Sequence, residues 1–160
     1  MTSLVNLGLR VGELLKERGE TVAVSESAAG GLISASLLSV SGASAYYLGG
    51  ASVYTRSARR GLLRFDDTMA QMRGSTEEYA VLTASTIREI VGADWAVGES
   101  GAAGPSGNRY GDPAGHAAIA VSGPVTATRV IKTNDDDREA NMRVFCKEAL
   151  DFLYETVSEN

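Results

Sequence analysis

The feature that most constrains the fold of this chain is the segment from Thr21 to Gly31, which reads Thr-Val-Ala-Val-Ser-Glu-Ser-Ala-Ala-Gly-Gly. It begins with β-branched and apolar residues, continues with hydroxyl groups, and ends with two glycines. The residues from Leu32 to Leu38 then favour a helix. This order predicts a strand, a tight turn and a helix, an arrangement that leaves backbone N–H groups free beyond the carboxyl end of the strand. Ser25 and Ser27 therefore lie at a candidate ligand site, although either serine could simply cap the helix.

Length and composition limit the class of protein. A chain of 160 residues predicts one domain over 1–160, and 44% hydrophobic with 22% charged residues is typical of globular proteins. A net charge of -5 argues against a nucleic-acid partner, because phosphate contacts need a cationic surface. One cysteine and one histidine cannot build a zinc site, and nothing supports a carboxylate-only metal site. We found no secretory leader pattern or membrane-length apolar run, so we expect a cytoplasmic protein without a membrane partner.

Helical and extended patterns alternate along the chain. Apolar residues between Leu4 and Leu15 recur at helical spacing, and we expect this first helix to pack on a sheet. The alternation, with short turns, predicts a three-layer α/β/α sandwich with a mixed sheet. The other expected strands are Thr21–Ser25, Ala51–Tyr54, Asp94–Glu99, Gly115–Val121 and Thr126–Lys132, and the other expected helices are Leu32–Leu38, Arg56–Leu63, one from Ser75 to about Gly92 and one after Asp136.

A second glycine-rich turn, Ser100 to Gly107, follows the strand that ends near Glu99. If both turns meet at one pocket, hydroxyl groups would face backbone N–H groups across it. Such a pocket suits a nucleophilic serine beside an oxyanion hole, or a bound phosphate without any chemistry. The polar segment from Asn108 to Gly115 is a candidate for a mobile rim of that pocket.

Several other classes of site are disfavoured or left open by the residues. No Gly-Lys-Ser/Thr follows the first turn and no Gly-x-Gly-x-x-Gly is present there, which excludes a Walker loop and the dinucleotide fingerprint. A structural role is expected for His116, because nothing near it resembles a catalytic triad. Cys146 lies among apolar helix positions, as a core residue would. The arginines of the 56–63 helix either bind a phosphate or form an exposed face.

Four ordered segments of the chain resemble the CinA C-terminal domain family, from the competence/damage-inducible proteins. They are Ser25–Gly31, Gly50–Arg59, Ser100–Gly107 and Asp137–Glu139, and the resemblance extends from about Leu4 to the last expected helix. The resemblance implies an α/β/α sandwich, no required cofactor, frequent homo-oligomers and a small-molecule nucleotide substrate. Family members with an assigned activity are nicotinamide-nucleotide amidases, which convert nicotinamide mononucleotide to nicotinate mononucleotide and ammonia.

The resemblance also implies roles for individual residues. Ser27 matches the serine of the family's Glu-Ser-Cys-Thr-Gly-Gly segment, the proposed nucleophile, with Ala28 and Ala29 in place of cysteine and threonine. Tyr54 matches the family tyrosine, and Arg59 occupies the position of the family lysine. The implied substrate-binding residues are Ser25, Gly30, Gly31, Gly101, Ala102, Gly104, Ser106 and Arg143.

The arginine at position 59 leaves the function open. A guanidinium stays protonated, so Arg59 cannot take a proton from Ser27 as a desolvated lysine can. Its charge could instead favour the tyrosinate form of Tyr54 as base, or bind a substrate phosphate; Glu26 is a further base candidate unless it only caps a helix. The first hypothesis is therefore a nicotinamide-nucleotide amidohydrolase. The alternatives are a catalytically silent relative that binds pyridine nucleotides or regulates a partner, and a hydrolase of another amide or ester.

Overall fold

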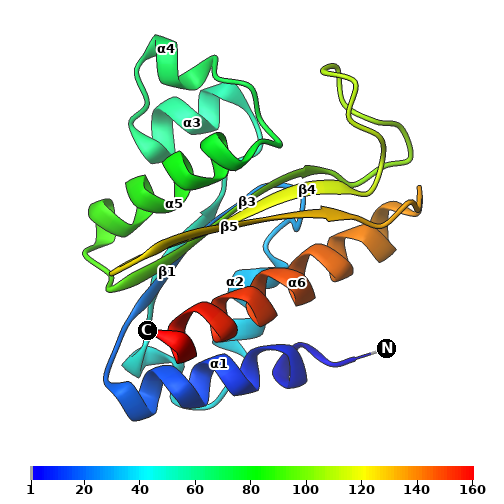
Figure 1. The fold of residues 1–160 in the computed structure, drawn as a ribbon. Helices are drawn as coiled ribbons and strands as arrows, with labels where there is room; N and C mark the ends of the chain where they lie inside the picture. Colours follow the sequence, from blue (N-terminus) through cyan, green and yellow to red (C-terminus); the bar gives the residue numbers. More distant parts are fainter. Residues whose placement is uncertain (1) are drawn as a thin grey trace.

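A five-stranded mixed sheet forms the centre of the protein, as seen in a computed structural model that describes residues 2–160 (Figure 1). The strand order is β2-β1-β3-β4-β5; β1 is parallel to β2 and β3, while β4 is antiparallel to both of its neighbours. The strands are β1 (Val22–Glu26), β2 (Tyr47–Ser52), β3 (Trp95–Ala102), β4 (His116–Ser122) and β5 (Thr126–Lys132).

Helices cover both faces of this sheet (Figure 1). One face carries α2 and α6, with α1 packed against both of them, and the other face carries α5 together with α3 and α4. The helices are α1 (Leu4–Arg18), α2 (Leu32–Leu38), the short η1 (Ala43–Ala45), α3 (Arg56–Leu63), α4 (Asp67–Ala70), α5 (Glu77–Val91) and α6 (Arg138–Glu159). The three-layer α/β/α sandwich with a mixed sheet is therefore confirmed.

Local sequence signals set the ends of the longer helices. The Thr76 hydroxyl accepts a hydrogen bond from the Tyr79 N–H at the start of α5, and the Asp137 carboxylate does the same for Ala140 in α6. Gly19 and Gly92, both in the left-handed region, end α1 and α5. These boundaries agree closely with the sequence expectations because caps and terminal glycines act locally.

Other details depart from the expectations. The first helix, α1, packs mainly on α2 and α6 rather than on the sheet, since other helices already cover that face. The strand expected at Ala51–Tyr54 starts earlier, at Tyr47, because it pairs with β1 from Val22 onwards. Strand β3 continues to Ala102, into the stretch expected to be a turn, because β4 pairs with it there. The four-residue helix α4 had no sequence signal that we identified.

The topology brings the ends of three strands together. Since β1, β2 and β3 run parallel, the residues that follow each strand lie at one edge of the sheet. The chain leaves β1 through α2 on one face and returns to β3 through α5 on the other, so the direction of winding changes beside β1. Ligands of open α/β sheets bind at such a switch point.

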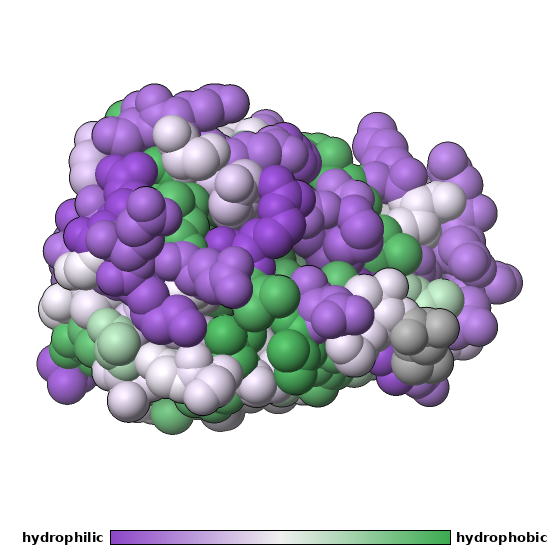
Figure 2. Space-filling model, turned by 90° about the horizontal axis from the view of Figure 1, so that it is seen from below, coloured by the Kyte–Doolittle hydropathy of each residue, from purple (hydrophilic) through white to green (hydrophobic). Residues whose placement is uncertain are grey.

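On the face shown in Figure 2, polar residues cover much of the area and apolar residues lie in smaller groups between them. Helix α1 leaves Val5 and Leu9 partly exposed, and Leu38 and Leu48 are exposed on other elements. Among residues 2–160, none of the helices has both the length and the apolar character needed to cross a lipid bilayer.

Candidate functional site

The first glycine-rich turn connects β1 to α2 and is organised by buried side chains. Glu26, the last residue of β1, is almost fully buried, and its carboxylate accepts hydrogen bonds from the N–H groups of Ile33 (3.0 Å) and Ser34 (2.9 Å). It therefore caps α2, in agreement with the capping role considered for it. Ser25 is only 2% exposed within β1, where it pairs with neighbours on β2 and β3.

A second buried carboxylate, that of Glu99 on β3, joins this turn from the neighbouring strand. Its Oε2 accepts hydrogen bonds from the N–H groups of Ser27 (3.0 Å) and Ala29 (2.9 Å). The other oxygen, Oε1, is buried and has no hydrogen-bond partner among the described residues. The turn that carries Ser27 is thus tied directly to the strand that leads into the second turn.

The environment of Glu99 makes its ionisation unfavourable. Burial raises the pKa of Glu99 to about 7; the backbone N–H groups of Ala29, Ser27 and Ala28 oppose this rise, and the nearby Glu26 adds to it. Because the pKa in the folded protein exceeds that of an unfolded chain, the free energy of unfolding falls as pH rises from about 4.5 to about 7. At higher pH the ionised group costs about 3 kcal/mol of stability.

The second turn, after β3, is held in place by α6. The buried Asn141 side chain donates a hydrogen bond to the Ala103 carbonyl at 2.8 Å, and the Arg138 guanidinium donates one to the Gly104 carbonyl. Gly104 has a φ of +113°, and a Cβ there would lie 2.5 Å from the Asp136 carbonyl oxygen. Only glycine fits at this position, so the turn and the start of α6 can approach closely.

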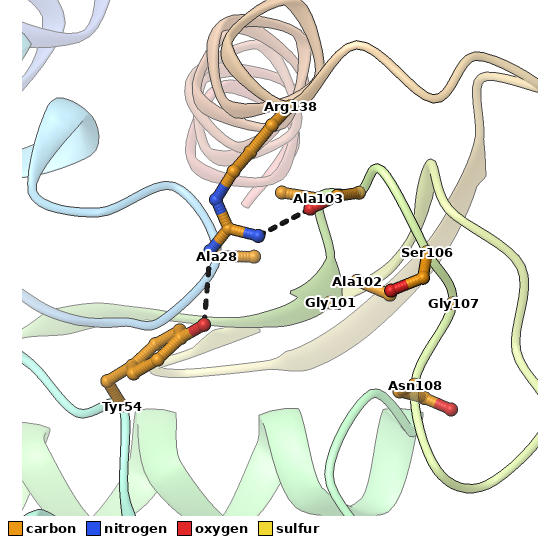
Figure 3. Close-up of a pocket in the computed structure, with 10 residues that line it drawn as sticks. Ala28, Tyr54, Gly101, Ala102, Ala103, Ser106, Gly107, Asn108 and Arg138 are labelled. Carbon is orange, nitrogen blue, oxygen red and sulfur yellow. Dashed lines mark hydrogen bonds between the residues drawn. The ribbon is translucent and has the colours of Figure 1, made fainter.

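A cavity of about 260 Å³ lies where the two turns meet (Figure 3). It is small for a ligand site and has polar walls, which suits a small polar ligand. Arg138 points across it, and its Nη2 donates a hydrogen bond to the Tyr54 hydroxyl at 3.1 Å. The lining residues are Ala28, Tyr54, Gly101, Ala102, Ala103, Gly104, Ser106, Gly107, Asn108 and Arg138.

The sequence reasoning placed some candidates at this cavity and others elsewhere. Tyr54, Gly101, Ala102, Gly104 and Ser106 line it. Ser27 is partly exposed next to the lining residue Ala28, but is not itself part of the lining. The candidates that the structure does not bring into the lining are Ser25, Ser27, Gly30, Gly31, Arg59 and Arg143.

Two arginines have other partners than expected. Arg59 donates hydrogen bonds to the carbonyls of Ala70 (3.0 Å) and Met72 (2.7 Å), and its guanidinium stacks over the ring of Tyr79. It therefore fastens the α4 segment to α5, and Arg138 rather than Arg59 bonds to Tyr54. Arg143 faces away from the cavity and pairs with Glu139 one turn earlier on α6.

Sequence reasoning missed Arg138, Asn108 and Glu99. Arg138 was inside a quoted segment, Asp137–Glu139, but it had no assigned role. Glu99 carried a signal that could have been used: it ends a strand expected to be buried, and carboxylates are rarely buried without a partner. Asn108 has no distinctive sequence signal, since its position depends on the loop that carries it.

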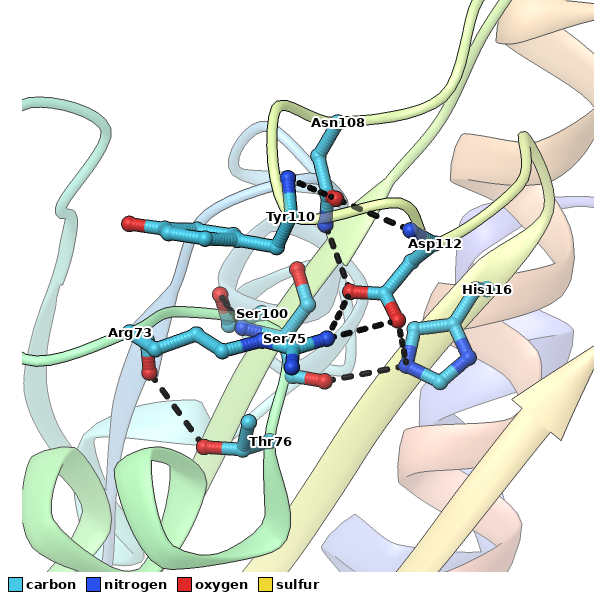
Figure 4. Close-up of polar contacts among 8 residues, drawn as sticks. All are labelled: Arg73, Ser75, Thr76, Ser100, Asn108, Tyr110, Asp112 and His116. Atoms are coloured by element: carbon cyan, nitrogen blue, oxygen red, sulfur yellow. Dashed lines mark hydrogen bonds and ion pairs between the residues drawn. The ribbon is translucent and has the colours of Figure 1, made fainter.

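That loop, predicted as a mobile rim, is tied down at its centre (Figure 4). One guanidinium nitrogen of Arg73 contacts both oxygens of Asp112 (2.8 and 2.9 Å), and the Asn108 amide donates to the same carboxylate. Burial alone would raise the pKa of Asp112, but hydrogen bonds from Asn108 and Arg73 and the nearby His116 together lower it. His116 Nε2 lies 2.9 Å from the Ser75 carbonyl oxygen, in line with a structural role.

We expect Arg73→Ala to loosen this loop without unfolding the protein. The Arg73–Asp112 pair is half-exposed, so its loss costs about 1 kcal/mol and should speed exchange of the Asn108 and Gly111 amides about fivefold. Hydrogen-exchange NMR measures the effect. Arg60→Ala is the control, because Arg60 pairs with Asp67 on a different segment; equal acceleration in both variants would contradict a local anchor.

Comparisons with known proteins point to one family. The family model for the CinA C-terminal domain matches residues 5–157. A CinA-like protein of Prochlorococcus marinus is 39% identical over 113 residues, covering 70% of this chain and 26% of the relative. A CinA-like protein of Salinibacter ruber is 34% identical over 160 residues, covering 98% of this chain and 38% of the relative. The chain thus spans about a quarter to two fifths of the length of these curated relatives.

Solved structures agree with the sequence matches. The chain is similar to a competence-damaged protein (CinA) superfamily protein of Klebsiella pneumoniae, with a TM-score of 0.91, 27% identity, and coverage of 99% of this chain and 100% of that one. It is also similar to a competence damage-inducible protein A from another strain of that species, with a TM-score of 0.90, 28% identity and coverage of 98% of both chains.

Proposed function

We propose, from the premise that this chain belongs to the CinA C-terminal domain family, that it is an amidohydrolase acting on a nicotinamide nucleotide. The observation that carries the proposal is that the two turns, from β1 and β3, meet at one small polar cavity. Water would convert the carboxamide of nicotinamide mononucleotide to the carboxylate of nicotinate mononucleotide and release ammonia. The cavity volume of about 260 Å³ favours a mononucleotide over a dinucleotide.

In the proposed reaction, Ser27 Oγ attacks the carboxamide carbon and passes its proton to a base. Backbone N–H groups of the second turn hold the negative oxygen that forms. The C–N bond then breaks, ammonia leaves with a proton, and water hydrolyses the resulting ester. Tyr54 is the proposed proton carrier, because its hydroxyl group lies at the cavity and accepts a hydrogen bond from Arg138.

Arg138 is the proposed binding residue for the substrate phosphate. Two of its N–H groups bond to the Gly104 carbonyl and to Tyr54, and a guanidinium has five such donors, so donors remain for a phosphate. We expect Arg138→Ala to raise KM for nicotinamide mononucleotide about tenfold. Arg143→Ala should change KM much less, because Arg143 pairs with Glu139. A larger effect of Arg143→Ala on KM would favour Arg143 as the substrate-binding arginine, as the family resemblance implies.

The alternative of a catalytically silent binding protein is favoured by Arg59. In place of a lysine that could act as base, the position holds an arginine that bonds to two backbone carbonyls. Ammonia release from nicotinamide mononucleotide by the purified chain, with calorimetry on the same sample, separates the two functions. Release supports the amidohydrolase; binding without release supports the silent relative; neither binding nor release argues against both.

We also propose that the protein forms a homo-oligomer and is located in the cytoplasm. The resemblance to the CinA C-terminal domain family is the ground for proposing a homo-oligomer. Light scattering of the purified chain tests this. A cytoplasmic location fits an enzyme that recycles pyridine nucleotides, and cell fractionation tests it.

A further inference from the structure

Glu99 is a buried carboxylate to which the proposed reaction assigns no step. It is 2% exposed, and it lies on β3 two residues before Gly101, where the cavity lining begins. Through Oε2 it also bonds to the N–H groups of Ser27 and Ala29 in the other turn. A single side chain thus connects both turns that form the cavity.

Apart from Ser27 itself, the turn has no polar side chain that could replace this connection. Ala28 and Ala29 carry only methyl groups, where the family segment has a thiol and a hydroxyl. Buried backbone N–H groups need an acceptor, and Glu99 provides one for two of them. If Glu99 were lost, these donors would be left without their acceptor and the turn would be free to shift.

The carboxylate is also unfavourable for stability, which sets it apart from ordinary buried residues. Its Oε1 is buried without a partner among the described residues, so the group is only half satisfied. At a position that serves packing alone, an apolar residue would give a higher free energy of unfolding. Ionisable groups retained at such a cost occur preferentially at functional sites.

We propose that Glu99 is a positioning residue for Ser27: its ionised carboxylate holds the Ser27–Ala29 turn against β3, and its protonation weakens that hold. The inference rests on the proposed function in one respect, namely that Ser27 is the nucleophile. A carboxylate accepts stronger hydrogen bonds from N–H groups than a neutral carboxyl group does. The alignment of Ser27 with the second turn should therefore depend on the charge of Glu99.

The surrounding groups define the pH range of this effect. Glu26 of β1 faces Glu99 and, as a like charge, raises its pKa further beyond the effect of burial. The thiol of Cys146 on α6 also faces it; burial raises the pKa of that thiol to about 11, so it stays neutral. The positive charge of Arg143 on α6 partly opposes the rise in the pKa of Cys146. Since the pKa of Glu99 is about 7, its hydrogen bonds to the Ser27–Ala29 turn should weaken as pH falls below about 7.

Steady-state kinetics with nicotinamide mononucleotide between pH 5.5 and 9 test the proposal. We expect kcat of the parent to decrease as pH falls below about 7, which gives the pH profile an acid limb. Glu99→Gln should lack this acid limb, and its kcat at pH 8 should be about tenfold lower than that of the parent. Glu99→Ala should lose about 100-fold, because glutamine keeps an acceptor oxygen and alanine does not. Glu26→Gln removes an equally buried carboxylate at the end of β1 and should keep the acid limb, moved to lower pH because Glu26 no longer raises the pKa of Glu99. An acid limb unchanged in Glu99→Gln overturns the proposal.

NMR of the parent separates this inference from the proposed function. The amide protons of Ser27 and Ala29 should shift together as Glu99 titrates, with a midpoint near pH 7, while amides of α5 stay constant. If the parent releases no ammonia, the proposed function fails, and the amide titration alone decides whether Glu99 holds the turn. Amides that do not titrate overturn the inference, whether or not the enzyme is active and whether or not the variants fold.

Discussion

Ser27→Ala should lower kcat for ammonia release from nicotinamide mononucleotide at least about 10³-fold, with KM changed little. Removing the hydroxyl removes the covalent route, and what remains is the slower attack of water on a bound carboxamide. KM should be preserved because the residues that line the cavity, and the contacts they can make with the nucleotide, are unchanged. A coupled ammonia assay under saturating substrate measures the ratio of the two kcat values.

Ser106→Ala is the matched control for that experiment. Ser106 carries the serine hydroxyl group of the cavity lining, and we expect its loss to lower kcat less than about tenfold, as for a binding contact. Similar rates for Ser27→Ala and the parent would remove Ser27 as nucleophile. A larger loss in Ser106→Ala than in Ser27→Ala would move the nucleophile to the second turn.

Arg59→Ala should lower the free energy of unfolding by about 3 kcal/mol. The substitution removes two charge-assisted hydrogen bonds to the carbonyls of Ala70 and Met72, each worth about 1.5 kcal/mol or more, and the stacking on Tyr79. Burial raises the pKa of Tyr79 and the charge of Arg59 opposes this, so the two groups interact directly. Urea unfolding followed by circular dichroism gives the change.

Two further variants show whether position 59 is structural or catalytic. Arg60→Ala, one residue along α3, removes only an exposed pair with Asp67 and should stay within about 0.5 kcal/mol of the parent. Arg59→Lys should lose an intermediate amount, because an ammonium group can still donate to carbonyls but lacks the planar guanidinium that stacks on Tyr79. If Arg59→Lys instead released ammonia much faster than the parent, the pocket of the parent would be intact and would lack only a general base.

The interpretation of Arg59 illustrates the limit of reasoning from a motif. Its place in the Gly50–Arg59 segment suggested a partner for Tyr54, because both residues lie in the same matched stretch. In the fold, α3 turns Arg59 towards α5, and Tyr54 instead meets Arg138 from the far end of the chain. A spacing of five residues gives no direction for either side chain once a helix starts between them.

Local sequence alone determined the elements whose signals lie within a few residues. Short-range sequence patterns account for the strand, turn and helix of Thr21–Leu38, for the caps at Thr76 and Asp137, and for the family resemblance. Residues 2–160 adopt the α/β/α layers that these patterns predict. Only the tertiary structure decided that Glu99 bonds to Ser27 and Ala29, and that Arg138 reaches Tyr54. These contacts join residues 70 to 84 positions apart, and they exist because parallel strands bring distant turns to one edge of the sheet.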